Sequence, residues 1–388
     1  MRAIGLMSGT SLDGIDVALV DLRPRGASYA YDVVRFATVP FADDLRGRLV
    51  AALPPHAANV AEIALLDRDL GDAFGAAAAY VAGDERVDFV ASHGLTLFHR
   101  GDAAMTLQIG DPYRIRDAVD ATVVFDFRRA DCALGGHGAP LVPFVDALLF
   151  ATSDRDTVAL NLGGIANVTV LTAGAHAGDA LAWDTGPGNM LVDAFVTRRT
   201  HGAERYDAGG KRAARGTIDE RALHELIARE AFYFVQPPPK STGRERFGTQ
   251  LLDAHAELFA DMPLDDACAT LTAYTVATIG DALERYGPAR ARLIVSGGGA
   301  HNATLVAGLA ARLPAYEVAR SDAFGVDPDA KEALAFALLG YETLRGRRAN
   351  LPRATGASRA AVLGAIVPHD LATLLAQIAV EVAANGAG

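Results

Sequence analysis

Short apolar runs alternate along the chain with longer stretches in which apolar positions recur every three or four residues. The short runs predict β-strands and the longer stretches predict α-helices. The predicted strands include residues 2–7, 15–22, 122–125, 157–160, 168–171 and 292–296. The predicted helices cover residues 61–82, 190–199, 220–228, 264–286, 303–313, 329–344 and 371–384. Strands that alternate with helices of this length are typical of an α/β protein.

Glycine marks three of the turns between these elements. The turns at residues 9–14 and 161–167 each join two apolar runs, and they predict β-hairpins with polar tips. The turn at residues 297–299 instead joins a strand to a helix. A hairpin-like glycine turn therefore recurs in each half of the chain.

Composition and charge limit the class of protein. The chain has 388 residues, of which 51% are apolar and 21% charged, so it is long enough for two domains and too apolar to be disordered. It carries 36 Lys and Arg against 47 Asp and Glu, a net charge of −11. This balance argues against a nucleic-acid partner, because Lys and Arg supply most of the affinity for phosphate backbones. Any anionic ligand must be held by backbone N–H groups, helix N-termini or a few placed cations.

Cysteine use and hydropathy point to the cytoplasm. Cys132 and Cys268 are the only cysteines and are far apart in sequence, so spacing predicts neither a disulfide framework nor a thiolate zinc site. Residues 3–7 form too short an apolar stretch for a signal peptide. Charged or turn residues interrupt every apolar run well short of the ~20 residues that a membrane span needs. We therefore expect a cytoplasmic protein with no membrane partner.

Of two common nucleotide-binding motifs, the Walker-type P-loop is absent from the sequence and the dinucleotide fingerprint is only approached. Residues 210–212 and 239–241 lack the glycine spacing of a Walker-type P-loop. Residues 297–299 approach a dinucleotide fingerprint, but Asn302 stands where its last glycine belongs. Nicotinamide or flavin binding is thus disfavoured.

The first glycine turn favours phosphate chemistry. Its glycines let a backbone approach a ligand, its hydroxyls suit phosphate oxygens, and the carboxylates of Asp13 and Asp16 suit hydrated Mg²⁺. An ordinary hairpin turn has a similar composition. The second turn, at residues 161–167, tips the interpretation, because two such hairpins facing each other from two halves would clamp a nucleotide.

Asp184 is the candidate catalytic carboxylate. It stands at a strand end beside a Gly-Pro-Gly turn, at residues 186–188. Carboxyl ends of strands are where α/β folds place catalytic groups, and Asp184 could act there as a general base. It could equally bond its own turn, and the residues alone favour neither role.

Other polar residues carry weaker signals. Arg128 or Arg129 could supply a donor fork for a phosphate or carboxylate, although an Arg pair after a strand is more often a surface salt bridge. His93 lies in a tight turn, where a lone histidine is usually structural. Glu332 could merely complement a helix dipole, and the cationic loop at residues 240–245 could serve only solubility.

Several motifs together carry a family resemblance. They are residues 5–16, 92–94, 126–128, 135–143, 161–167, 183–189, 240–245 and 296–302. On these motifs the chain resembles the anhydro-N-acetylmuramic acid kinases, in order from Met1 to about residue 365. The three glycine turns alone would indicate only the wider superfamily of sugar kinases, actin and heat-shock ATPases.

The resemblance implies a fold and a reaction. The fold would be a two-domain, actin-like (ribonuclease H-like) sugar-kinase fold with a nucleotide cleft between the domains. Domain I would comprise residues 1–130 and 355–388, and domain II residues 131–354. The enzyme would open the 1,6-anhydro ring of 1,6-anhydro-N-acetylmuramic acid with water and phosphorylate O6 from ATP with Mg²⁺. The products would be N-acetylmuramic acid 6-phosphate and ADP, in peptidoglycan recycling, and the resemblance also implies a homodimer.

Two alternatives stay open beside this reading. One is a plain sugar kinase of the same fold, in which Asp184 would deprotonate a sugar hydroxyl without ring opening. The other is a nucleotide-switched interaction protein of the actin or heat-shock ATPase type.

The resemblance also implies residue roles. Asp184 would be the catalytic base that activates water, and Arg128, Glu332 and His93 would bind the sugar. Asp13 would lie near the magnesium ion. The residues implied to bind ATP are Gly9, Thr10, Ser11, Leu12, Asp13, Gly14, Ile15, Asp16, Asn161, Gly163, Gly164, Gly297, Gly298 and Gly299.

The chain departs from the family pattern in two places. Leu95 stands where the family usually has Gln, which puts in doubt any polar contact to sugar from that position. Residues 371–388 extend past the usual family end and predict an additional amphipathic helix, which could pack on the first domain or on a partner subunit.

Overall fold

The computed structural model describes residues 1–9, 12, 14–25, 28–53, 56 and 58–384. The chain forms two compact units, Met1–Leu149 with Ala330–Gly388, and Phe150–Asp329. These boundaries differ from the predicted ones, because residues 131–149 and 330–354 belong to the first unit. The reason is packing: helix α15 (Lys331–Leu344) lies on strands of the first sheet. Its Lys331 also forms a buried ion pair with Asp146 of α5 (Val142–Phe150), with 2.8 Å between Nζ and Oδ1.

The first unit is built on a seven-stranded sheet. Its strands are β1 (Arg2–Ser8), β2 (Ile15–Arg25), β3 (Ser28–Val39), β4 (Phe89–Arg100), β5 (Met105–Ile109), β6 (Thr122–Phe125) and β12 (Ala365–Val367). They lie in the order β12-β6-β4-β1-β2-β3, with β5 paired to β4. Strands β1, β2 and β3 are antiparallel neighbours, whereas β1, β4 and β6 run parallel.

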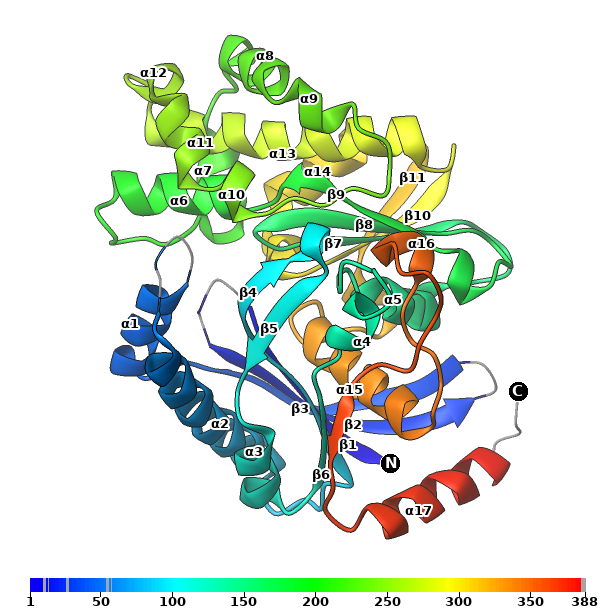
Figure 1. Ribbon diagram of the computed structural model, residues 1–388. Helices are drawn as coiled ribbons and strands as arrows, with labels where there is room; N and C mark the ends of the chain where they lie inside the picture. The colour runs from blue at the N-terminus through cyan, green and yellow to red at the C-terminus, as the bar shows by residue number, and fades with distance from the viewer. Residues whose placement is uncertain (10–11, 13, 26–27, 54–55, 57, 385–388) are drawn as a thin grey trace. The chain divides into compact units, whose positions relative to one another are not determined.

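The second unit repeats this plan with five strands (Figure 1). They are β7 (Thr157–Leu162), β8 (Ile165–Leu171), β9 (Leu181–Pro187), β10 (Ala291–Ser296) and β11 (Tyr316–Arg320), in the order β11-β10-β7-β8-β9. Strands β7, β8 and β9 are antiparallel neighbours, and β7, β10 and β11 run parallel. The same strand order in both units confirms the predicted α/β, two-domain actin-like fold.

Helices cover the sheet of the first unit. They are α1 (Asp43–Ala52), α2 (Val60–Ala82), α3 (Pro112–Val119), α4 (Arg129–Cys132), α5, α15, α16 (Pro352–Thr355) and α17 (Leu371–Ala384). Alternate residues of β1 face different helices. Ile4 and Leu6 are buried in the core that α2 completes, whereas a Cβ on Gly5 would lie 1.8 Å from the carbonyl oxygen of Ala333 in α15. Glycine at position 5 therefore allows α15 to lie directly on the sheet.

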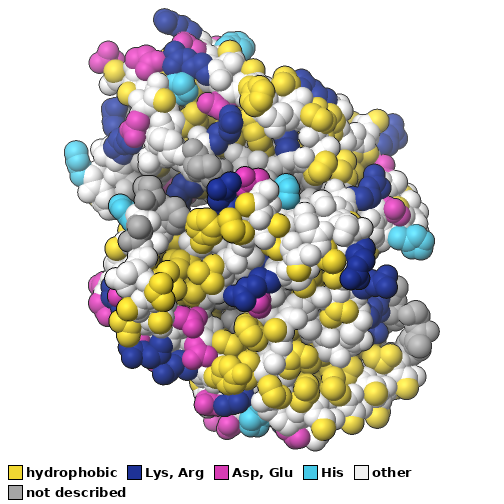
Figure 2. Space-filling view, in the orientation of Figure 1, with side chains coloured by type: hydrophobic (Ala, Val, Ile, Leu, Met, Phe, Trp, Pro, Cys, Tyr) yellow, Lys and Arg dark blue, Asp and Glu magenta, His cyan; other side chains and the backbone are white. Residues whose placement is uncertain are grey.

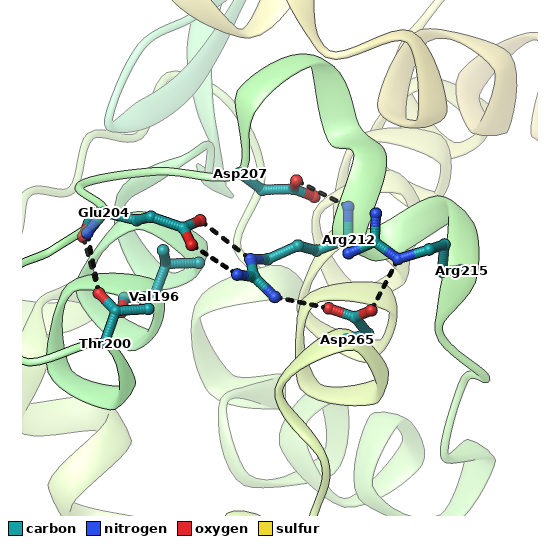
Figure 3. A network of polar contacts seen from close by, with 7 residues as sticks. All are labelled: Val196, Thr200, Glu204, Asp207, Arg212, Arg215 and Asp265. Atoms are coloured by element: carbon teal, nitrogen blue, oxygen red, sulfur yellow. Dashed lines mark hydrogen bonds and ion pairs between the residues drawn. The ribbon is translucent and has the colours of Figure 1, made fainter.

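The second unit carries helices α6 (Met190–Arg199), α7 (Lys211–Arg215), α8 (Glu220–Arg229), α9 (Ala231–Phe234), α10 (Arg244–Phe247), α11 (Thr249–Ala254), α12 (Ala256–Phe259), α13 (Leu264–Tyr286) and α14 (Ala303–Arg312). The long helix α13 packs against α6, α7, α8, α14 and β9 (Figure 1). Arg212 ties α7 to its surroundings, with ion pairs of 2.8 Å to Asp265 on α13 and 2.6 Å to Glu204 (Figure 3). These ion pairs hold α7 against α13 and against the segment that contains Glu204.

Helix α17 packs on the first unit, one of the two arrangements that the sequence left open. Leu374 and Ile378 are buried, and a Glu381 Oε1 atom lies 2.9 Å from the Met1 ammonium nitrogen. Hydrophobic side chains gather at the lower edge of the face in Figure 2, where α17 runs in Figure 1. Val380 of α17 is 69% exposed. None of the helices in the described ranges has the length and apolar character needed to cross a bilayer.

Candidate active site

The first predicted phosphate hairpin is present as the β1–β2 pair. The backbone N–H of Leu12 donates to the carbonyl of Gly9 at 3.2 Å, although the Leu12 side chain itself is buried. A Cβ on Gly14 would lie 2.6 Å from a carbonyl oxygen of β3, so this position requires glycine. Ile15 is buried in the core and can offer a ligand only its backbone. Asp16 is half-buried, and its Oδ1 accepts a hydrogen bond of 2.6 Å from Thr38.

Thr10, Ser11 and Asp13 lie outside the described residues, so the assignment of Mg²⁺ to Asp13 stays a prediction. Within the described part of the chain, no three His, Cys, Asp or Glu side chains group together as a protein-only metal site would require. Mg²⁺ usually keeps several waters and takes one or two carboxylates plus substrate phosphates. A single carboxylate at the tip of a glycine turn fits that donor set.

The second hairpin and the turn after β10 form one glycine-rich surface in the second unit. Ser296, at the end of β10, pairs with Asn161 of β7. Gly297 has φ +78°, and a Cβ there would lie 2.7 Å from Oδ1 of Asn161. A Cβ on Gly299 would lie 2.6 Å from the Leu162 side chain, whereas one on Gly298 would meet nothing within 4 Å. Gly297 and Gly299 thus let the turn pack on the hairpin, and Gly298 leaves open backbone for a ligand.

The turn of the second hairpin is similarly accessible at one position. The nearest atom to a Cβ on Gly163 would be 3.6 Å away, an ordinary contact, whereas a Cβ on Gly164 would lie 2.8 Å from the end of the Met190 side chain. Gly163 and Gly298 are therefore the two glycines of these turns at which a Cβ would meet no close contact from the rest of the protein. At these two positions the backbone is open to a ligand, which the resemblance implies to be phosphate at Gly163 and the nucleoside at Gly298.

Asp184 lies on β9 and is held by the segment that contains residues 233–242. Its backbone N–H donates to the carbonyl of Lys240 at 3.0 Å. Its own carbonyl accepts from the Tyr233 hydroxyl at 2.7 Å, and its Oδ2 accepts from the backbone N–H of Thr242 at 2.8 Å. Asp184 therefore does more than close its own turn. A distant loop fixes both its backbone and its carboxylate.

Lys240 is part of the same assembly. Its Nζ donates to the carbonyl of Tyr233 at 2.9 Å and lies 4.4 Å from the centroid of the Tyr233 ring. Burial, together with the charge of Arg285, lowers the pKa of Lys240 to about 8, while Asp184 acts in the opposite direction. The loop at residues 240–245, which on composition could serve only solubility, thus surrounds the candidate base. Sequence reasoning missed Tyr233, Lys240 and Thr242 as functional residues, although the motif at 240–245 was among those carrying the resemblance.

The first unit brings together the three residues implied to bind sugar. His93 lies on β4, Arg128 follows β6, and Glu332 is in the first turn of α15. Arg128 donates from Nε to His93 Nε2 at 2.9 Å. Burial lowers the pKa of Arg128 to about 10, and the nearby Glu332 carboxylate opposes that shift. Strand β6 runs parallel to β4 and pairs with its first four residues, so His93 and Arg128 both lie just beyond the paired stretch.

His93 holds Arg128 in a defined state. The His93 ring is 4% exposed and packs against Phe336, with 4.7 Å between ring centroids. Because Nδ1 lies 2.9 Å from the Gly94 carbonyl, Nδ1 carries the proton and Nε2 accepts from Arg128. Burial and the Arg128 charge hold the pKa of His93 well below its ordinary value. Both ring nitrogens are thus engaged within the unit, and a direct contact from His93 to sugar stays a prediction.

Two neighbouring residues resolve doubts left by the sequence. Arg129 is 59% exposed and forms a salt bridge of 3.3 Å with Asp126, so the surface-salt-bridge interpretation applies to it and not to Arg128. Leu95 is completely buried in the first core. It therefore offers no contact to a ligand, polar or otherwise.

Comparison with known proteins identifies the relatives of this chain. The family model described as "Anhydro-N-acetylmuramic acid kinase" matches residues 1–369. An anhydro-N-acetylmuramic acid kinase from Streptomyces coelicolor is 43% identical over 374 residues, covering 95% of this chain and 94% of the relative. One from Xanthomonas oryzae pv. oryzae is 44% identical over 376 residues, covering 94% and 97%.

Among solved structures, the chain is similar to the activator of the 2-hydroxyisocaproyl-CoA dehydratase from Clostridium difficile with bound ADPNP. The TM-score is 0.45 and the sequence identity 13%, over 88% of this chain and 94% of that one. The fold assignment rests on the strand order described above.

Proposed function

Because the chain belongs to the anhydro-N-acetylmuramic acid kinase family, we propose that it converts 1,6-anhydro-N-acetylmuramic acid to N-acetylmuramic acid 6-phosphate. The match of the family model over residues 1–369 carries this proposal, because it includes every residue assigned a role here. It disfavours the nucleotide-switched interaction protein.

Asp184 is the base in this reaction. Its carboxylate takes a proton from water as the water oxygen attacks the anomeric carbon and the bond from that carbon to O6 breaks. O6 is thereby freed to accept a phosphoryl group. ATP supplies that group when bound, with Mg²⁺ neutralising the charge of the phosphates. The hydrogen bond from Thr242 to Oδ2 orients the carboxylate toward the water.

Backbone N–H groups hold the phosphates. The net charge of −11 gives the chain no general attraction for phosphate, whereas the backbone at Gly163 is open to a ligand. The hairpin at residues 9–16 supplies a second set of backbone donors, and Asp13 is the proposed protein ligand of the magnesium ion. Such donor sets bind phosphate without side-chain charge.

Arg128 and Glu332 hold the sugar. A guanidinium fork suits a carboxylate such as that of the lactyl substituent, and a carboxylate suits sugar hydroxyls. His93 fixes the fork from behind through Nε2. We also propose that the protein works in the cytoplasm, where its two buried cysteines stay reduced, and that it is a homodimer.

The first experiment is the mass of the product formed from 1,6-anhydro-N-acetylmuramic acid with ATP and Mg²⁺. The expected gain is one phosphoryl group plus one water. A gain of phosphoryl alone would support the plain sugar kinase. Consumption of ATP with no sugar product would support the nucleotide-switched protein.

Replacement of the base tests the residue assignment. Asp184→Asn should lower kcat by roughly 10²–10⁴-fold, the usual contribution of a general base, while ATP affinity stays near normal. Asp261→Asn, at an exposed position of the same unit, is the matched control and should leave kcat unchanged. Substantial activity in Asp184→Asn would mean that another group is the base.

A further inference from the structure

The contacts around Asp184 close into a ring of interactions within the second unit. The Tyr233 hydroxyl donates to the Asp184 carbonyl. The Lys240 carbonyl accepts from the Asp184 N–H, and the Thr242 N–H donates to Asp184 Oδ2. Lys240 in turn contacts Tyr233. Its Nζ donates a hydrogen bond to the Tyr233 carbonyl and lies over the Tyr233 ring. The contact between Lys240 and Tyr233 therefore links the two segments that bond Asp184.

We propose that Tyr233 and protonated Lys240 are positioning residues that fix the orientation of the Asp184 carboxylate. This inference rests on the role of Asp184 in the proposed function. Neither residue needs to touch substrate. Together they act through Asp184, by holding the strand that carries it and the loop that bonds its Oδ2.

The chemistry of the contact requires a cation. Lys240 Nζ caps the carboxyl end of α9, where it donates to the carbonyls of Tyr233 at 2.9 Å and Phe234 at 3.3 Å. Cationic side chains are favoured at helix carboxyl ends, and an ammonium is attracted to the face of an aromatic ring. A neutral amine loses the charge term of both interactions. A lysine that served only solubility would extend into water, whereas Lys240 is half-buried.

The surroundings of Lys240 define how pH acts on the contact. The titratable and charged groups on the elements around it are Asp184 on β9, Glu230 and Tyr233 at α9, Arg246 on α10, and Arg285 and Tyr286 on α13. Arg246 pairs with Glu230 at 3.0 Å, so these two charges largely offset each other. Because burial and Arg285 favour the neutral amine, Lys240 loses its proton as the pH rises through about 8. The contact therefore weakens on the alkaline side.

Substitutions in the full-length protein test this inference. Lys240→Met removes the charge and both hydrogen bonds, and it should lower kcat by about 10–100-fold, as expected for a misplaced catalytic group, with the KM values for sugar and ATP nearly unchanged. Lys240→Arg keeps a cation and should restore most of kcat. Tyr233→Phe removes only the hydroxyl and should lower kcat by about tenfold or less.

Matched controls and a pH profile separate positioning from a general structural role. Lys211→Met and Tyr206→Phe change the same residue types at exposed positions of the second unit, and they should leave kcat unchanged. The kcat of the unmodified protein should decline as pH rises through about 8. In Lys240→Arg this decline should move to higher pH, because a guanidinium stays protonated.

The inference would be overturned by a kcat for Lys240→Met close to that of the unmodified protein, by a loss expressed only in KM, or by an unchanged alkaline decline in Lys240→Arg. If Lys240→Met gives no cooperative thermal transition, Tyr233→Phe decides the question by the same split of kcat from KM. Asp184→Asn separates the two proposals. Full activity in Asp184→Asn would contradict the assignment of Asp184 as the base. An inactive Asp184→Asn together with a fully active Lys240→Met would contradict only the positioning role of Lys240.

Discussion

The two units hold their candidate functional groups by different means. In the first unit, one side chain holds another: His93 accepts from Arg128, the charge of Glu332 acts on Arg128, and backbone carbonyls add one bond to each of His93 and Arg128. In the second unit, backbone groups make most of the contacts that hold Asp184. Its own N–H and carbonyl and the N–H of Thr242 all take part in these hydrogen bonds.

This difference predicts what each unit is sensitive to. A cluster of buried and half-buried ionisable side chains depends on protonation and on complete charge pairing. A site made of backbone groups depends instead on local conformation, and side-chain charge matters only where it fixes that conformation. Removal of a charge should therefore damage the first unit most, and an added methyl group should damage the glycine turn of the second.

The largest effect in this comparison is expected for Arg128→Met. It leaves Glu332 without its opposing charge and His93 Nε2 without its donor, so kcat/KM for the sugar should fall by about 10²-fold or more. Arg129→Met changes the adjacent residue, which is exposed, and serves as the control. Steady-state kinetics with varied sugar measure both. Equal effects of the two substitutions would contradict the assignment of Arg128 to the site.

The sequence predicted the elements better than their assembly. The predicted helices at 190–199, 264–286 and 371–384 agree with α6, α13 and α17. The domain boundaries were wrong because they depend on which sheet residues 330–354 pack against. Periodicity shows that a helix has a buried face, and not which partner covers it.

The candidate site shows the same limit. Gly298 and its neighbours could be found from the sequence, because three consecutive glycines after a strand are a local signal. The interactions of Arg128 with His93 and with the charge of Glu332 join residues far apart in sequence, and only the resemblance placed them in one site. Tyr233 was not found by either route, since its role depends on one hydroxyl that reaches β9.

An effect of intermediate size is expected in the glycine turn of the second unit, where substitutions at two neighbouring glycines can be compared. Gly297→Ala places a Cβ at φ +78° and ψ 172° and close to Asn161 Oδ1, so it should cost about 1–3 kcal/mol of stability for this backbone conformation, plus the contact. Gly298→Ala has open space and should change stability by less than about 0.5 kcal/mol. It should instead raise the KM for ATP, because its methyl group lies where the nucleoside of ATP would approach. Thermal midpoints and ATP kinetics separate the two, and equal midpoints would show that the turn does not depend on Gly297.

The smallest effect concerns protonation in the first unit. Because burial holds the pKa of His93 in the folded protein well below its ordinary value of 6.5, the unfolded chain binds more protons than the folded chain below about pH 6.5. His93 therefore supports the fold at neutral pH, and this support is lost as the pH falls, by at most about 1.4 kcal/mol per pH unit. His93→Gln removes that dependence, so the difference in thermal midpoint between the variant and the unmodified protein should shrink from pH 7.5 to 5.5. His224→Gln, at an exposed position of the second unit, should track the unmodified protein throughout. A constant difference for His93→Gln across this range would mean that His93 contributes packing alone, and that the first unit is no more sensitive to protonation than the second.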